Sequence, residues 1–245
     1  MKLSNRLEMV VSFVKAGESA ADIGTDHGHV PVELVRRGIV KRAYAMDVRK
    51  GPLSKAEENV AAAGLKEKIE TRLSDGVRKL SVGEAETVII AGMGGELVIH
   101  IMEDGRHVWD TVEQWVLSPH SEIHKVREWL ECNGFVIVKE DMVFEDGKFY
   151  TILDVRKGEN FRVAAADESR ESDSLSEREK DYRYSKFLRT CKHPVFIAYL
   201  KDEEEKLLGL KANLEKQAAH SERAKESMRE VEEKLAMNRE VQNEM

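Results

Sequence analysis

Small residues and carboxylates occur together at four places in the N-terminal half of this chain. The segments are Asp22-Ile23-Gly24-Thr25-Asp26-His27-Gly28, Met46-Asp47-Val48, Ser74-Asp75-Gly76 and Ala91-Gly92-Met93-Gly94-Gly95. Carboxylates accept hydrogen bonds from hydroxyl, amino and ammonium groups, and glycines let a ligand approach the backbone closely. Each segment ends a short apolar run, although Asp and Gly are also ordinary turn residues. All four together, in this order, indicate a small-molecule site along one edge of a sheet.

The first segment disfavours a dinucleotide cofactor. A dinucleotide fingerprint requires Gly-x-Gly-x-x-Gly from Gly24, but Asp26 and His29 occupy the later glycine positions. A pyrophosphate would therefore meet negative charge instead of open backbone. A cofactor that carries positive charge and lacks phosphate suits these residues better, and S-adenosyl-L-methionine is a sulfonium with an amino-acid tail. We therefore predict S-adenosyl-L-methionine, with Asp22 or Asp26 facing its positive charges.

The later segments suit the adenosine part of this cofactor. Asp47 stands 23 residues beyond Gly24, where a carboxylate can accept hydrogen bonds from both ribose hydroxyls, although this spacing alone does not separate the two cofactors. Asp75 is expected to face the adenine amino group. Met93 either contacts the cofactor or fills the core. The predicted cofactor-binding residues are Asp22, Gly24, Gly28, Asp47, Val48, Asp75, Gly76, Ala91, Gly92 and Met93.

A mostly parallel α/β sheet has to position these segments. Short apolar runs alternate with amphipathic stretches over residues 20–156, a pattern typical of strands and helices that wind such a sheet. The expected strands are residues 20–24, 43–48, 69–73, 87–91, 115–118, 136–144 and 149–155. Helices are expected near Pro31, over residues 52–64 and over residues 121–132. Asp146-Gly147 between the last two strands predicts an antiparallel hairpin.

The C-terminal part has a different composition. Residues 159–178 are rich in Ala, Ser, Asp and Glu, which predicts a lightly ordered segment. After Pro194, apolar residues recur at intervals of three and four, with a polar interruption over residues 217–223. This pattern predicts two antiparallel helices. The expected domains are therefore a catalytic domain over residues 1–158, a linker over 159–185 and a helical coiled-coil hairpin over 186–245.

Composition excludes several classes of protein. The chain has 245 residues, a formal net charge of -7 and two cysteines, Cys132 and Cys191, that fit neither a disulfide framework nor a zinc site. The histidines lack metal-ligand spacing, so we predict no metal. No apolar run approaches the roughly 18 to 20 residues of a bilayer helix, and the N-terminal residues do not resemble a signal peptide. The expected location is the cytoplasm.

Several segments together resemble one known family. They are Leu3-Ser4-Asn5-Arg6-Leu7, Ala21-Asp22-Ile23-Gly24-Thr25-Asp26-His27, Gly51-Pro52-Leu53, Ser74-Asp75-Gly76 and Ala91-Gly92-Met93-Gly94-Gly95. Over essentially its whole length, the chain resembles the bacterial tRNA (adenine-N1)-methyltransferases that act on adenine 22. The resemblance implies a Rossmann-like, class I methyltransferase domain that uses S-adenosyl-L-methionine, followed by a coiled-coil hairpin. Many members have Ala-Tyr at Gly28-His29 and Gln-Pro-Asn at Ser118-Pro119-His120, so no role is carried over to His29 or His120.

Methyl transfer to adenine N1 requires little chemistry from the protein. The ring nitrogen has a free lone pair, so the Asn-Pro-Pro-Tyr element that serves exocyclic amines is not needed. The product is a cation, which a nearby negative charge stabilises. We hypothesise that Asp26 supplies this charge, with or without accepting a proton from the adenine amino group, and that His27 assists as a second catalytic residue. The alternatives are a helix-cap or turn role for Asp26 and a loop-bracing role for His27.

The resemblance also implies a tRNA partner. The predicted RNA-binding residues are Arg6, Arg36, Arg37, Arg42, Pro119, Arg183, Lys186 and Arg189. Basic residues are expected to cluster near the first two strands, and residues 178–192 mix basic and aromatic side chains that can hold phosphates and stack bases. The alternative for this segment is a solvated helix face with its aromatic residues packed inward.

Two other classes of function stay open from the sequence alone. One is a methyltransferase for a small molecule or a protein. The other is a non-catalytic protein that binds S-adenosyl-L-methionine and acts through its coiled coil. The expected oligomeric state is a monomer, with a dimer through the coiled coil as the alternative.

Overall fold

The computed structural model describes residues 3–158, 175–218 and 222–245. The chain divides into two compact units, Met1–Asp173 and Ser174–Met245. Helix α7, Leu175–Tyr184, belongs to the second unit, although we had predicted a linker over residues 159–185. The first part of that predicted linker, residues 159–174, lies outside the described residues.

A seven-stranded sheet with the order β3-β2-β1-β4-β5-β7-β6 forms the first unit. Its strands are β1 Gly17–Ile23, β2 Val40–Asp47, β3 Ile69–Leu73, β4 Thr87–Met93, β5 Gln114–Pro119, β6 Phe135–Glu145 and β7 Lys148–Lys157. β1 to β5 are parallel, whereas β7 is antiparallel to both β5 and β6. All seven predicted strands are present, and the mostly parallel sheet with its final antiparallel hairpin is confirmed.

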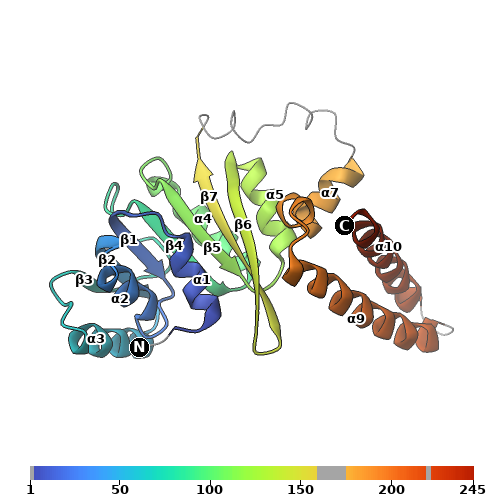
Figure 1. The fold of residues 1–245 in the computed structure, drawn as a ribbon, viewed down its shortest axis with the longest axis horizontal. Helices are drawn as coiled ribbons and strands as arrows, with labels where there is room; N and C mark the ends of the chain where they lie inside the picture. The colour runs from blue at the N-terminus through green and yellow to red at the C-terminus, as the bar shows by residue number, and fades with distance from the viewer. Residues whose placement is uncertain (1–2, 159–174, 219–221) are drawn as a thin grey trace. The chain divides into compact units, whose positions relative to one another are not determined.

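Helices cover both faces of this sheet (Figure 1). They are α1 Asn5–Phe13, α2 His29–Arg36, α3 Lys50–Ala62, α4 Gly95–Asp104 and α5 Ile123–Cys132, with the 3-10 helix η1 Arg106–Val108. One apolar cluster joins α4 and α5 to one face, and a second joins α1, α2 and α3 to the other. Because both faces are buried, β4 reads as a continuous apolar run, with Val88, Ile89 and Ile90 all fully buried.

The β6–β7 hairpin follows directly from its turn residues. Asp146 and Gly147 both have positive φ, at 49° and 75°. These values match a type I′ turn, whose twist suits the two strands that it joins. The strands then pair from Glu145 opposite Lys148 to Phe135 opposite Lys157, with one shift of register between Ile137 and Lys139. The hairpin therefore forms a rigid outer edge of the sheet.

In the part of the second unit that the structure describes, residues 175–218 and 222–245, there are four helices. They are α7, α8 Lys186–Thr190, α9 Pro194–Ala218 and α10 Glu222–Glu244. The pairs Arg239–Glu204 and Lys211–Glu232 show that α9 and α10 run antiparallel, which confirms the predicted helical hairpin. Tyr184 is fully buried, and its hydroxyl donates a hydrogen bond of 2.7 Å to the carboxylate of Glu203.

Two further results concern the described residues as a whole. No helix among them is long and apolar enough to cross a membrane. No group of three or more histidine, cysteine, aspartate or glutamate side chains among them could hold a metal ion.

Candidate active site at the carboxyl edge of the sheet

The sheet brings the four predicted segments to one edge. β1 pairs with β2 on one side and with β4 on the other, so Ile23 lies between Met46 and Ile90. β2 pairs in turn with β3, where Asp47 lies opposite Leu73. The residues that follow these strand ends therefore lie side by side, as predicted. In doubly wound sheets this edge is where ligands bind.

A buried carboxylate lies at the centre of this edge. Asp22, at the end of β1, is only 7% exposed, and burial raises its pKa to about 6. The neighbouring carboxylates of Asp26 and Asp47 raise that pKa further, while Thr25 opposes the shift. Among the described residues, no cationic side chain forms an ion pair with Asp22. A positively charged ligand would supply the missing partner.

The loop after β1 holds Asp26 outside the core. Its side chain is 78% exposed, and one oxygen lies 3.2 Å from Nε2 of His27. The N-cap of α2 is Gly28, in the left-handed region, and no side chain caps this helix. Asp26 is therefore not a helix-capping side chain, although its carbonyl accepts a bond from the amide of His29, 3.4 Å away. Its carboxylate is accessible to a substrate.

Neighbouring residues hold the histidines of this loop. His27 has a positive φ of 58°, and its carbonyl oxygen accepts a hydrogen bond of 2.8 Å from the side chain of Asn59 in α3. The rings of His27 and His29 stack, with centroids 5.5 Å apart and planes 7° apart. Burial, followed by the nearby His27, lowers the pKa of His29. The stacked pair therefore includes a neutral imidazole at pH 7.

The carboxylate of Asp47 is also buried, at the end of β2. It accepts a hydrogen bond of 2.7 Å from the amide of Arg49, which fixes its orientation. By contrast, Asp75 is exposed and pairs with Arg78 at 2.8 Å. Val48 beside Asp47 is an exposed apolar residue. A buried acceptor next to an exposed apolar surface suits a ribose that carries a flat base.

Tight backbone packing fixes the segment after β4. A Cβ atom on Gly95 would lie 2.7 Å from the carbonyl oxygen of Ser121 and 2.9 Å from that of Glu122. The amide of His120 donates a hydrogen bond of 2.9 Å to the carbonyl of Met93. The start of α4 and residues 119–122 therefore form one packed unit at the site.

Arg6 reaches this same segment from α1. Its guanidinium lies over the ring of Tyr150, 5.1 Å from the centroid. One of its nitrogens is 3.1 Å from the position that a Cβ on Gly92 would take, and Gly92 has a positive φ of 77°. A cation from the N-terminal helix therefore lies beside the small-residue loop, where the carboxylate-rich site would bind its ligands.

Comparisons with known proteins identify the family. Residues 3–153 match a family model described as a methyltransferase domain. The chain is 32% identical to the tRNA (adenine(22)-N(1))-methyltransferase of Bacillus subtilis over 241 residues, which cover 98% of this chain and 97% of that protein. This chain belongs to the tRNA (adenine(22)-N(1))-methyltransferase family.

Solved structures of this methyltransferase family share the fold of the whole chain. The crystal structure of the B. subtilis m1A22 tRNA methyltransferase superposes with a TM-score of 0.83 at 31% identity, covering 98% of this chain and 99% of that chain. A Streptococcus pneumoniae protein in complex with S-adenosyl-L-methionine gives a TM-score of 0.81 at 36% identity, covering 98% of this chain and 100% of that chain.

The predicted RNA-binding residues of the first unit separate into two groups in this methyltransferase. Arg6 and Pro119 lie at the carboxyl edge with Asp26. Arg36 and Arg37 end α2, and Arg42 lies near the start of β2, so these three are at the opposite, amino edge. The predicted basic cluster is therefore split, because a helix that follows a strand runs back and ends at the other edge.

Ion pairs already engage several of these basic side chains. Arg37 binds the carboxylates of Glu8 and Glu33, and Arg36 also binds Glu33. In the second unit, Arg189 binds Asp181 and Glu244. Arg183 and Lys186 are half-buried on α7 and α8. Structural pairing thus accounts for Arg36, Arg37 and Arg189, whereas Arg42 is exposed.

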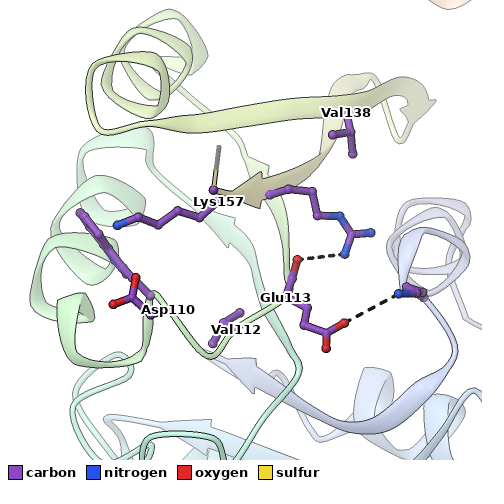
Figure 2. Close-up of a pocket in the computed structure, with 9 residues that line it drawn as sticks. Asp110, Val112, Glu113, Val138 and Lys157 are labelled. Atoms are coloured by element: carbon purple, nitrogen blue, oxygen red, sulfur yellow. Dashed lines mark hydrogen bonds and ion pairs between the residues drawn. The ribbon is translucent and has the colours of Figure 1, made fainter. Parts of the chain in front are cut away.

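A cavity of about 670 Å³ lies at the amino edge, away from the candidate site (Figure 2). Arg156 donates a hydrogen bond of 3.0 Å to the carbonyl of Glu113, whose carboxylate lies 3.7 Å from the ammonium of Lys15. Lys157 lies 3.9 Å from the centroid of the Trp109 ring, and burial lowers its pKa. Lys15 and Glu113 thus form an ion pair at this cavity, and Arg156 pairs with the nearby carboxylate of Asp154.

Two residues that support the site were not predicted from the sequence. Asn59 braces His27, and Tyr150 supports Arg6, but neither was among the predicted site residues, although each lies in a predicted helix or strand. Each contact joins residues that are far apart in the sequence. Asn59 lies 32 residues after His27, so no local signal could reveal this hydrogen bond.

Proposed function

We propose that this protein transfers a methyl group from S-adenosyl-L-methionine to N1 of adenine 22 in tRNA. The buried, cation-free carboxylate of Asp22 beside the accessible carboxylate of Asp26 carries the proposal. This arrangement suits a cationic methyl donor and a product that becomes a cation. A tRNA substrate would place the enzyme in the cytoplasm.

The residues at the edge fit the parts of the donor. Asp22 would face its positively charged amino-acid end, and Gly24 and Gly28 would leave backbone room for that end. Asp47 would accept hydrogen bonds from the ribose hydroxyls, and Val48 would lie against the adenine. Asp75 would face the adenine amino group once its pairing with Arg78 adjusts. When bound, S-adenosyl-L-methionine supplies an electrophilic methyl group at this edge.

Asp26 would be the residue nearest the developing charge. Adenine N1 uses its own lone pair to form the new bond to carbon, while the bond between carbon and sulfur breaks and its electron pair stays on sulfur. The attacked ring becomes a cation, and the carboxylate of Asp26 stabilises it electrostatically. His27, 3.2 Å from Asp26, would orient that carboxylate. Ala91, Gly92, Met93 and Gly76 would shape the space in which the base approaches.

The target base must leave the folded RNA before it can react. Enzymes that modify a base within a stacked structure extrude it into their site. Arg6 lies beside Gly92 and is placed to contact a phosphate next to the extruded base. Pro119, at the end of β5, would line the other side of the site. Arg42, Arg183 and Lys186 would bind parts of the tRNA farther from the reaction.

Mapping of the modified nucleotide tests this proposal. Purified protein is incubated with an unmodified tRNA transcript and methyl-labelled S-adenosyl-L-methionine, and reverse transcription then locates the modification. We expect a stop at adenine 22, and no label in a matched transcript with guanine at that position. Label transferred to a protein or a small molecule instead would favour another class of methyltransferase. Tight cofactor binding without any transfer would favour a non-catalytic binding protein.

A further inference from the structure

Two aromatic side chains lie at the tip of the β6–β7 hairpin. Phe144 and Phe149 are directly opposite each other across the strands, with ring centroids 4.7 Å apart and planes inclined by 46°. Phe144 is 51% exposed, so a large part of this residue is open to solvent. Large aromatic residues are usually buried, so the exposed Phe144, packed on the partly buried Phe149, offers an aromatic surface that a partner can cover.

The strand register places this pair beyond the carboxyl edge. β5 and β7 pair with Leu117 opposite Leu153, and β5 ends at Pro119. Continued by two residues, the same register puts Thr151 opposite Pro119, so Phe149 lies about 7 Å farther out at roughly 3.4 Å per residue. Figure 1 shows the hairpin extending past the ends of the parallel strands. The aromatic tip thus overhangs the edge that carries the candidate site.

The carboxylate of Glu145 ties the tip to α1. It accepts hydrogen bonds of 2.6 Å and 3.3 Å from the amides of Asn5 and Arg6. Burial alone would raise the pKa of Glu145, but these bonds and one from Ser4 outweigh it and lower the pKa. Arg6 then contacts Tyr150 on β7 and lies beside Gly92. The tip is therefore held at a fixed position relative to the small-residue loop.

We propose that Phe144, supported by Phe149, stacks against an unpaired base of the RNA substrate next to the methylated adenine. This inference rests on the proposed function. Extrusion of one base leaves its neighbours partly unstacked, and an aromatic ring can replace the lost contact. Stacking does not require a basic surface, which agrees with the mixed charges of Asp146 and Lys148 at this tip. Two rings offer far less than the roughly 800 Å² per partner of a stable protein interface.

Three substitutions of Phe144 separate stacking from other contacts. Phe144→Ala should raise both the KM and the Kd for tRNA about tenfold, the loss expected for one base–aromatic stack. Phe144→Leu keeps an apolar side chain without an aromatic face and should be nearly as impaired. Phe144→Trp should restore binding. The Kd for S-adenosyl-L-methionine should not change in any of them, because the tip lies outside the cofactor residues.

Salt dependence provides a second readout. Phosphate contacts weaken steeply with ionic strength, whereas stacking does not. The ratio of the Kd values of Phe144→Ala and wild type should therefore be the same at about 50 mM and about 200 mM salt. Val82→Ala is the matched control, because Val82 is an apolar residue that is 63% exposed in the segment between β3 and β4. Its KM should equal that of the wild type.

Failure of this inference can be told apart from failure of the proposed function. If the wild type methylates adenine 22 and Phe144→Ala has an unchanged KM and Kd for tRNA, the stacking role is wrong. The same holds if Phe144→Leu binds tRNA as well as the wild type, which would indicate a contact with a protein or another apolar group. If the wild type transfers no methyl group to tRNA, the proposed function itself fails. Thermal unfolding of each variant confirms that the fold is intact.

Discussion

The two edges of the sheet carry charge in different ways. At the amino edge, opposite charges are paired, as in Lys41–Glu18, Lys15–Glu113 and Arg156–Asp154. At the carboxyl edge, Asp22 has no cationic partner among the described residues, and Asp26 has the imidazole of His27 beside it. Paired charges on a surface contribute little beyond solubility and local order. Carboxylates without a cation are costly to bury, and their retention indicates a positively charged ligand.

Asp26→Asn should have the largest effect. The substitution keeps the size of the side chain but removes its charge, so turnover should fall by about a hundredfold or more, as is typical for the loss of such a group. The Kd for S-adenosyl-L-methionine should stay within about twofold, since burial and hydrogen bonding at Asp22 and Asp47 are untouched. Steady-state kinetics and calorimetric titration measure the two quantities.

Asp110→Asn is the control from the other edge. Asp110 is an exposed carboxylate that lines the cavity in Figure 2. Its neutralisation should leave turnover unchanged. Equal losses in the two variants would mean that charge at the carboxyl edge has no special role.

Asp22→Asn should change the pH dependence of stability. The pKa of Asp22 is about 6 in the folded protein, against an ordinary value of 3.8. A raised carboxyl pKa contributes stability that is complete below the unfolded value and is lost as the pH rises through about 6. The variant, which has no charge to bury, should therefore gain stability over the wild type as the pH rises from about 4 to about 7, by up to about 3 kcal/mol, and the gain should stay constant above that.

Urea unfolding across this pH range measures the difference. A gap between the two proteins that does not change with pH would show that Asp22 is ionised at no cost. Cofactor affinity offers a second check. Because a cationic ligand prefers the ionised carboxylate, wild-type affinity for S-adenosyl-L-methionine should fall below about pH 6, and the variant should bind it weakly at every pH.

Gly95→Ala should destabilise the carboxyl edge. The added methyl group would overlap the carbonyl oxygens of Ser121 and Glu122, so the start of α4 must move. We expect a loss of about 1 to 3 kcal/mol in the free energy of unfolding, together with reduced turnover. Gly209→Ala in α9 is the matched control, since a Cβ there meets no atom of the surrounding residues within 4 Å. That variant should be unchanged or slightly stabilised, because alanine favours helix. Denaturant unfolding measures the free energy of unfolding of both variants. An equal change in the two would contradict the close packing described at Gly95.

Arg6→Ala should impair tRNA binding, whereas Arg37→Ala should impair stability. Arg6 lies at the carboxyl edge, and its loss should raise the KM for tRNA about tenfold through a lost phosphate contact. Arg37 bonds to Glu8 and Glu33, so its loss should lower the melting temperature and leave the KM nearly unchanged. Kinetics at two salt concentrations, with thermal unfolding in parallel, distinguish these outcomes. If Arg37→Ala raised the KM for tRNA more than Arg6→Ala did, the RNA-binding surface would lie at the amino edge instead.

Local sequence patterns predicted the central strands well because β4 and β5 are short, mostly buried runs of largely apolar residues. The run at residues 87–91 became β4, Thr87–Met93, and the Asp146-Gly147 turn produced the expected hairpin. Helices with weak start signals were missed. α4 begins at Gly95 directly after a strand, and neither a polar cap nor a proline marks its start. α1 was also not predicted, although its sequence carries helix signals: Ser4 caps its start, and Leu7, Val10, Val11 and Val14 recur at helical spacing on its buried face.

The same limit applies to the site. The order of strands in a doubly wound sheet predicts which loops meet, so the grouping of Asp22, Asp47 and Gly92 followed from the sequence. The contacts that orient these loops did not. Glu145 binds the amide of Asn5 across 140 residues, and only the folded sheet brings the two together. The position of Arg36 and Arg37 at the amino edge was open to reasoning, because α2 had to run back along the sheet.

A crystal structure with S-adenosyl-L-homocysteine, the demethylated form of the cofactor, tests the central claim most directly. We expect its amino-acid end beside Asp22 and Gly24, its ribose on Asp47, and its sulfur directed toward the space beside Asp26 and Gly92. The cavity at the amino edge, near Glu113 and Lys157, should hold none. Density for the ligand in that cavity, with an empty carboxyl edge, would contradict the account.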